Sequence, residues 1–229
     1  MTTSVEDPSK YGVVIVDESQ NGRITKFVEK PKQFISNKIN AGMYIFNISV
    51  LERIELKPHM LEKDIFPKMA EEGQMHACHL TGFWMDIGFP KDFLIGTKYY
   101  LQFLKDRGSD ELAKGDNIIG NVLIHPSAKV DSSSVIGPNV VIGENVTVMR
   151  GARLTDCCIF SKTLIKSHAF IRNSIIGWQN IIGQWVRIEG VSVVAEDVQI
   201  KDEVFINESF ILPHKNISSS IPNPGTIVM

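Results

Sequence analysis

The chain has 229 residues and a mass of 25.6 kDa, which suits one large or two small domains. A formal net charge of −2 and an ordinary 22% of charged residues disfavour nucleic acid as the main partner. No apolar run approaches the roughly 20 residues that cross a bilayer, and the first residues lack the basic and apolar regions of a signal peptide. We therefore expect a cytoplasmic protein without a membrane partner. Its three cysteines, two of them adjacent, form neither a disulfide framework nor a zinc spacing.

The first half of the chain has the pattern of an α/β domain, which we place at residues 1–107. Residues 11–16 are nearly all apolar, which predicts a strand buried on both faces. Asn21-Gly22 predicts a hairpin turn between this strand and a partner over residues 23–29. Further strands are expected over residues 39–46, 75–80 and 83–87, and helices over residues 50–56, 62–72 and 91–105. Residues 108–117 are polar and glycine-containing, and we assign them as a linker.

Two charged residues close the second of these strands. Pro31 ends the strand and moves Lys30 out of the α region, so that Glu29 and Lys30 are presented at a strand end, where α/β sheets bind ligands. A carboxylate there can accept sugar hydroxyls, and an ammonium can meet a phosphate. The alternative is a solvated strand end with a surface ion pair, which contributes little.

Asn40 and Asp86 are two further candidates. Asn40 precedes Ala41-Gly42, whose small side chains let a ligand approach the backbone, although a turn at the start of a strand explains it equally. Asp86 stands between Met85 and Ile87 in an apolar stretch, where a carboxylate needs a partner. That partner is either Mg²⁺, for which carboxylate oxygen is a suitable ligand, or a backbone amide or Lys91.

The second half carries a repeat with a period of six residues. Aliphatic residues recur at every sixth position, with two one-residue slips, through three runs: residues 124–154, residues 159–171, and residues 176–212, which end at Leu212. A hexapeptide period fits neither a helix nor a flat strand, and it is typical of a parallel β-helix in which each hexad forms a short strand and a turn. We predict this fold for residues 118–229, with about five coils of three hexads each.

Histidines in this repeat admit a catalytic interpretation. His168, with His125 and His214 nearer the ends, could serve as the base of a hexapeptide acyltransferase. A plain turn residue is the alternative for each of them.

Several stretches together resemble the mannose-1-phosphate guanylyltransferases of the sugar nucleotidyltransferase family, in particular their catalytic β-type subunits. They are Asp7 to Val14, Phe27 to Pro31, Asn37 to Phe46, Gly82 to Gly88, Ile175 to Trp178, Ile182 to Arg187 and Ile211 to Lys215. The resemblance implies an incomplete Rossmann-like nucleotidyltransferase domain followed by a left-handed β-helix. The left hand rests on the resemblance alone, because parallel crossovers are usually right-handed.

The resemblance also implies a reaction and roles. Mannose 1-phosphate would attack the α-phosphorus of GTP, giving GDP-mannose and diphosphate, with Mg²⁺ as the cofactor. Gly12 would offer its backbone amide to the sugar, Glu29 and Asn40 would bind hydroxyls, and Lys30 would bind the sugar phosphate. Asp86 would bind the metal, and Lys30 and Asp86 are the catalytic candidates.

The chain departs from the family pattern at its start. The family's glycine-rich triphosphate loop and its second metal-binding aspartate are not found, so we expect a truncated form that is weak or inactive alone, with the strand at residues 11–16 left as an exposed edge. A regulatory subunit that uses the β-helix to form a homo-oligomer or to join a related subunit is the alternative function. A hexapeptide acyltransferase is a third.

Overall fold

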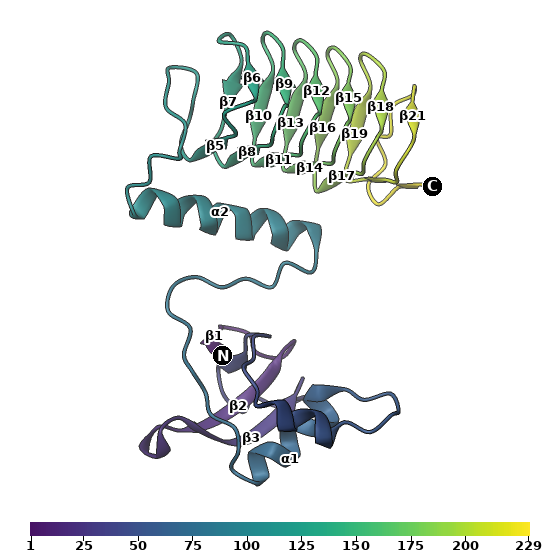
Figure 1. Ribbon diagram of the computed structural model, residues 1–229. Coiled ribbons are helices and arrows are strands. Elements are labelled where there is room, and N and C mark those ends of the chain that lie inside the picture. The colour runs from purple at the N-terminus through teal and green to yellow at the C-terminus, as the bar shows by residue number, and fades with distance from the viewer. The chain divides into compact units, whose positions relative to one another are not determined.

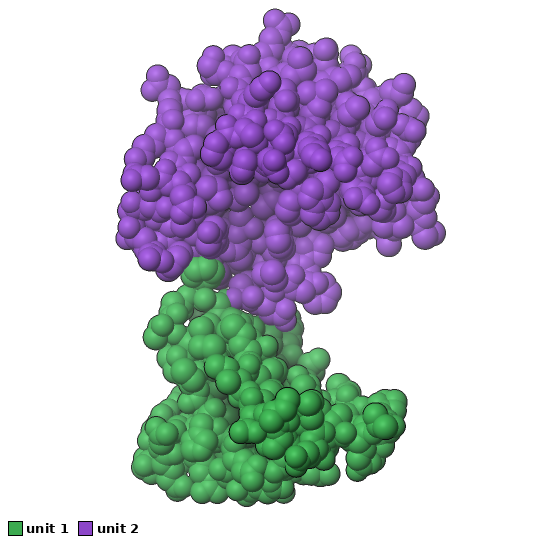
Figure 2. Space-filling model, viewed as in Figure 1, with its two compact units in different colours: residues 1–84 green, residues 85–229 purple.

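The computed structural model describes residues 1–229 and contains two compact units, residues 1–84 and residues 85–229 (Figures 1 and 2). Helix α2 (Pro90–Asp106) groups with the second unit by its packing. The predicted division into a domain of residues 1–107 and a domain of residues 118–229, joined by a linker at residues 108–117, stays a prediction. No helix combines the length and the apolar character that crossing a membrane requires.

The first unit is built on a four-stranded antiparallel sheet in the order β1-β4-β2-β3. The strands are β1 (Thr2–Ser4), β2 (Gly12–Asp17), β3 (Arg23–Glu29) and β4 (Lys38–Asn40). Strand β2 pairs with β3 on one side and with β4 on the other. The expectation that residues 11–16 form an exposed edge is therefore wrong, because β4 returns to cover that side.

Other elements of this unit are shorter than the sequence predicts. The β2–β3 hairpin is confirmed, with a 3₁₀ turn η1 (Glu18–Gln20) followed by Asn21 and Gly22, both at positive φ. The expected strand over residues 39–46 stops at Asn40, and residues 75–80 form only isolated bridges. The helical elements are η2 (Ile48–Arg53), η3 (Leu61–Ile65) and α1 (Phe66–Glu71).

One face of the sheet forms the core of the first unit. Val14 of β2 and Phe27 of β3 are paired across the strands and pack with Phe66 of α1. The Phe27 and Phe66 rings meet edge to face at 5.4 Å, and Tyr44 lies 5.0 Å from the Phe66 ring. This aromatic cluster holds α1 and the segment after β4 over the same sheet face.

The second unit is a parallel β-helix of about six turns with three sheets along its sides (Figure 1). The first sheet contains β5 (Val122–Ile124), β8 (Val140–Ile142), β11 (Cys157–Ile159), β14 (Ser174–Ile176), β17 (Ser192–Val194), β20 (Phe210–Ile211) and β22 (Ile227–Val228). The second contains β6 (Lys129–Val130), β9 (Thr147–Val148), β12 (Leu164–Ile165), β15 (Ile181–Ile182), β18 (Gln199–Ile200) and β21 (Asn216–Ile217). The third contains β7 (Val135–Ile136), β10 (Arg153–Thr155), β13 (Phe170–Arg172), β16 (Arg187–Glu189) and β19 (Phe205–Asn207).

The hexad ladder forms the core of this β-helix. Ladder residues such as Leu154, Ile171 and Ile188 are fully buried and stack in register across the third sheet. The prediction fails at Leu212, which is 41% exposed, while Ile211 is buried. A third one-residue slip therefore follows Ile206, and the fold extends past the ladder to β22, which raises the number of turns above the predicted five.

The slips have a common structural position. Each five-residue step leads from the third sheet back to the first through a non-glycine residue at positive φ, namely Asp156, Asn173 and Glu208. The corresponding step after Ile188 has six residues and turns at Gly190, also at positive φ. The corner between these two sheets thus varies in length by one residue while the stacked strands stay aligned.

Helix α2 belongs to this unit and packs on the outer face of the first sheet. Its buried residues are Leu94, Leu101 and Leu104. Thr97 Oγ1 lies 3.6 Å from Cys158 Sγ, and the Phe93 and Phe160 rings are 6.2 Å apart. All three cysteines are free; Cys157 and Cys158 are buried, while Cys78 in the first unit is exposed.

Candidate functional site

Three of the predicted site residues lie in one row across the sheet of the first unit. Gly12 of β2 pairs directly with Glu29 of β3. On the other side Val13 pairs with Ile39, which sets Asn40 of β4 beside Gly12. Paired residues in a sheet point to the same face, so the register alone brings Glu29, Gly12 and Asn40 together.

Gly12 lets neighbouring side chains pack against the centre of this row. A Cβ atom built on Gly12 would lie 2.9 Å from Glu29 Oε2 and 2.8 Å from Phe27 Cζ. The Glu29 carboxylate therefore rests against the Gly12 backbone, with its side chain only 14% exposed. Glycine is required here because any other residue would displace the carboxylate or the ring.

Lys30 projects from the end of the row. Its backbone N–H donates to Tyr11 O at 3.1 Å, and its φ of 45° is rare for a residue other than glycine. The side chain is 65% exposed, and Nζ lies 3.8 Å from Glu29 Oε1. The ammonium is thus available to an anion from solvent while it stays close to the carboxylate.

A chain of side-chain hydrogen bonds continues from Asn40. Its amide Nδ2 donates to the Tyr44 hydroxyl, which in turn donates to Glu62 Oε1 at 3.3 Å. Burial raises the pKa of Tyr44; Asn40 opposes that shift, and the carboxylates of Glu62 and Glu29 add to it. Sequence reasoning missed Tyr44 and Glu62, because the first was assigned to an apolar strand and the second to the surface of a helix.

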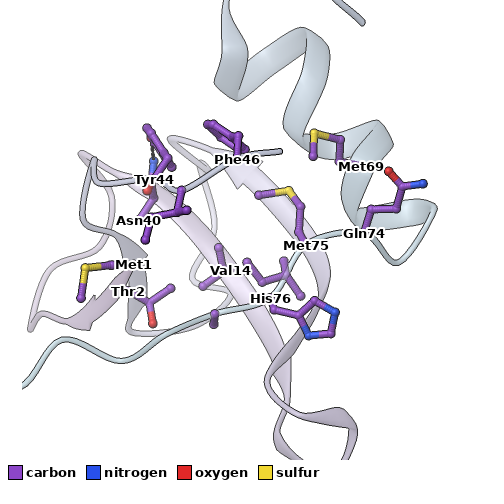
Figure 3. A pocket seen from close by; sticks show the side chains of 13 residues that line it. Met1, Thr2, Val14, Asn40, Tyr44, Phe46, Met69, Gln74, Met75 and His76 are labelled. Carbon is purple, nitrogen blue, oxygen red and sulfur yellow. Dashed lines mark hydrogen bonds between the residues drawn. The ribbon is translucent and has the colours of Figure 1, made fainter. Parts of the chain in front are cut away.

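A small cavity of about 100 Å³ opens beside this chain (Figure 3). Asn40 and Tyr44 line it together with Thr2, which pairs with Asn40 across β1 and β4 and is buried. The remaining lining is mostly apolar and includes Val14, Met69 and Met75, as the close view shows. Polar side chains therefore lie on both sides of the hollow, because Gln74 and His76 line it opposite Asn40 and Tyr44 (Figure 3).

Asp86 lies in the second unit and differs from its predicted environment. It is exposed and is not part of a strand, so the expected strand over residues 83–87 and the burial of its carboxylate are wrong. Asp86 Oδ1 accepts the Gly88 N–H at 3.1 Å, which matches the backbone-amide alternative. The bend at Gly88 and the start of α2 at Pro90 account for the loss of strand pairing.

The residues present can be compared with the needs of a magnesium ion. No cluster of three or more His, Cys, Asp or Glu side chains that could enclose a metal occurs in the structure. Mg²⁺ is, however, commonly held by one or two carboxylates together with substrate phosphates and water. The exposed Asp86 carboxylate fits the part of one such ligand.

His168 takes the position of a turn residue in the β-helix. Its φ is 63°, and its ring stacks on Trp185 with centroids 4.3 Å apart and planes 15° apart. His214 also turns at positive φ and has Nδ1 2.9 Å from Asp197 Oδ2. The turn interpretation is thereby confirmed for both.

Family models match both halves of the chain. The model described as nucleotidyl transferase matches residues 1–102, and the model described as GMPPB C-terminal domain matches residues 118–227. The first match lies within the predicted α/β half of the chain, and the second lies within the predicted β-helix half.

Curated relatives match the chain along its whole length. A probable mannose-1-phosphate guanylyltransferase 3 of Oryza sativa subsp. japonica is 50% identical over 228 residues, as is the mannose-1-phosphate guanylyltransferase catalytic subunit beta of Danio rerio. A mannose-1-phosphate guanylyltransferase 1 of Arabidopsis thaliana is 46% identical over 228 residues. In each case the match covers 100% of this chain, which spans 63% of the length of the relative.

Proposed function

Because the chain belongs to the nucleotidyl transferase family, with homologues named mannose-1-phosphate guanylyltransferase, we propose that its first unit binds the sugar phosphate of that reaction. The reaction joins mannose 1-phosphate to the guanylyl group of GTP, releasing diphosphate and giving GDP-mannose. GDP-mannose is a nucleotide sugar, so the proposed reaction belongs to nucleotide-sugar biosynthesis. We propose that the protein acts in the cytoplasm.

One observation carries this proposal, namely the row of Glu29, Gly12 and Asn40 with Lys30 at its end. A carboxylate and an amide on one sheet face can pair with adjacent hydroxyls of a sugar ring. The missing side chain at Gly12 lets the Glu29 carboxylate lie against the row, and the exposed Lys30 ammonium supplies the countercharge for a phosphate. The set therefore suits a ligand with hydroxyls on one side and an anion on the other.

The chemistry of these residues is positioning and charge compensation. Lys30 would hold the sugar phosphate as a point charge, and Glu29 would orient the ring so that a phosphate oxygen can attack. No covalent nucleophile is needed for such a transfer. Mg²⁺ would screen the phosphate charge when bound, and Asp86 of the second unit stays a prediction as one of its oxygen ligands.

Binding of mannose 1-phosphate by the full chain, measured by calorimetry, tests the proposal. Lys30→Ala should weaken binding of both mannose 1-phosphate and inorganic phosphate by about tenfold, since one charge-assisted contact contributes roughly 1.5–3 kcal/mol. Glu29→Gln should weaken binding of mannose 1-phosphate but should not weaken binding of inorganic phosphate. Lys32→Ala, which removes an exposed charge two residues away, is the control. Equal binding by wild type and both site variants would contradict the proposal.

Turnover is a separate question from binding. The expectation that this chain is weak or inactive alone stays a prediction, and pyrophosphate release with mannose 1-phosphate, GTP and Mg²⁺ measures it. Pyrophosphate release at ordinary enzyme rates would refute that expectation but would not contradict the proposed sugar-phosphate site.

A regulatory or oligomerising role is the second candidate function. The β-helix is fully packed along about six turns and presents several regular faces to a homologous subunit. Co-elution of the chain with a full-length relative in size-exclusion chromatography would support it, and separate elution would count against it.

A further inference from the structure

The outer face of the third β-helix sheet carries an alternating row of arginine and phenylalanine. Arg153 of β10 pairs with Phe170 of β13, Phe170 pairs with Arg187 of β16, and Arg187 pairs with Phe205 of β19. These four residues, which we call the arginine–phenylalanine ladder, run side by side along the solenoid beside β7 (Figure 1). The site proposed above does not use any of them.

The ladder is held in a fixed geometry. The Arg187 guanidinium lies over the Phe170 ring at 5.3 Å and over the Phe205 ring at 5.9 Å. The guanidinium of Arg172, two residues along β13, lies over the Phe170 ring at 6.0 Å. Stacking on the rings preorders the guanidinium planes, so less side-chain entropy is lost when they bind.

The charges on this face are only partly compensated. Glu189 Oε2 lies 2.8 Å from Arg187 and 3.5 Å from Arg172, and its side chain is 17% exposed beneath them. The Arg187 and Arg172 side chains are 56% and 54% exposed, and Arg153 is exposed as well. Two of the three arginines thus share one carboxylate, and the outward side chains of this sheet keep a net positive charge within a chain whose formal net charge is −2.

We propose that the arginine–phenylalanine ladder is a docking surface for an acidic segment of another protein. Each guanidinium presents a planar fork that binds a carboxylate through two N–H donors, and the rings beneath supply the apolar area of an interface core. Charge complementarity selects an acidic partner.

Two other occupants fit the face less well. Nucleic acid bases stack on open aromatic rings, whereas guanidinium groups already lie over Phe170 and Phe205. A second copy that paired this face with itself would bring the arginines of both copies together, with only Glu189 from each copy to offset them.

Fluorescence anisotropy of a labelled octaglutamate peptide, titrated with the full chain at low salt, tests the proposal. Arg187→Ala should weaken binding by about tenfold, as expected for a central arginine of an interface. Arg187→Lys keeps the charge but loses the fork and the stacking, and it should recover only part of that loss. Glu189→Gln should tighten binding because it frees both arginines.

Lys201→Ala is the control variant: it removes an exposed positive charge elsewhere on the β-helix and should leave octaglutamate binding unchanged. Thermal unfolding of every variant separates lost binding from lost fold. The proposal is overturned if octaglutamate does not bind, if Arg187→Ala binds like wild type, or if Arg187→Lys binds fully. It is also overturned if an oligothymidine of equal length binds more tightly through the same residues, or if Arg187→Ala changes the sedimentation mass of the chain.

Discussion

The two units of this chain obtain their order in different ways. In the β-helix every coil packs on its neighbours, and three columns of aliphatic side chains, one from each sheet, form a continuous core. The first unit has a core of seven buried residues around one short sheet and leaves large apolar side chains such as Ile45, Ile48 and Leu56 exposed. Repeated stacking thus stabilises the second unit, whereas in the first unit one end of the sheet carries the polar row of Glu29, Gly12 and Asn40.

The units also treat buried polar groups differently. In the β-helix Asn180 is fully buried, with Nδ2 donating to Ala195 O at 2.8 Å and Oδ1 accepting the Val198 N–H at 2.7 Å. In the first unit the Asn40 amide is engaged in the same way, with Nδ2 donating to the Tyr44 hydroxyl and Oδ1 accepting the Gly42 N–H at 3.1 Å. The Glu29 carboxylate instead lies 3.8 Å from the Lys30 ammonium and keeps acceptor capacity for a ligand.

The largest expected effect sharpens this contrast in stability. Ile182→Ala removes a fully buried ladder residue and should destabilise the β-helix by about 2–5 kcal/mol. Its neighbour Ile181 is only half-buried, so Ile181→Ala should have a much smaller effect. Denaturant unfolding followed by circular dichroism measures both, and equal losses would show that the ladder is not the core.

The second prediction concerns the polar row. Gly12→Ala forces a Cβ against Glu29 and Phe27 and should cost about 1–3 kcal/mol as overpacking, together with sugar-phosphate binding. Combining it with Glu29→Ala should recover part of the stability, since one of the two clashes is removed. Strictly additive losses in the double variant would contradict the geometry.

The third prediction tests the satisfied polar groups of the β-helix. Asn180→Ala leaves the Val198 N–H and the Ala195 carbonyl without their partner, which should cost about 1–3 kcal/mol. Gln199→Ala, on an exposed side chain of the same unit, is the control and should change the unfolding midpoint little.

The smallest effect is a pH dependence confined to the first unit. The folded state raises the pKa of Tyr44 above its usual value of about 10, so folding favours the protonated phenol. The stability this provides is present below pH 10 and is lost as pH rises through the folded pKa. Tyr44→Phe should reduce the alkaline loss of stability, and Tyr100→Phe, on an exposed ring, should not.

The β-helix could be predicted from sequence because the inward positions of a solenoid are occupied by aliphatic residues, and these recur at a fixed period in the sequence. The prediction failed at residues 211–212, where both neighbours are aliphatic and only the corner geometry shows which one points inward. In the first unit sequence reasoning proposed Gly12, Glu29, Lys30 and Asn40 as site residues, which stay predictions, but not their arrangement. That arrangement follows from the strand order β1-β4-β2-β3, a long-range property that no local pattern encodes.

The variable corner between the third and first sheets has a consequence for how such a chain changes length. Within this chain the step length varies along one corner of the solenoid, where Asp156, Asn173 and Glu208 lie in five-residue steps and Gly190 lies in a six-residue step. A residue gained or lost there leaves the register of every strand intact, whereas the same event in a strand would turn the ladder outward. That corner is therefore the natural place to graft a loop or a label onto this protein without disturbing its core.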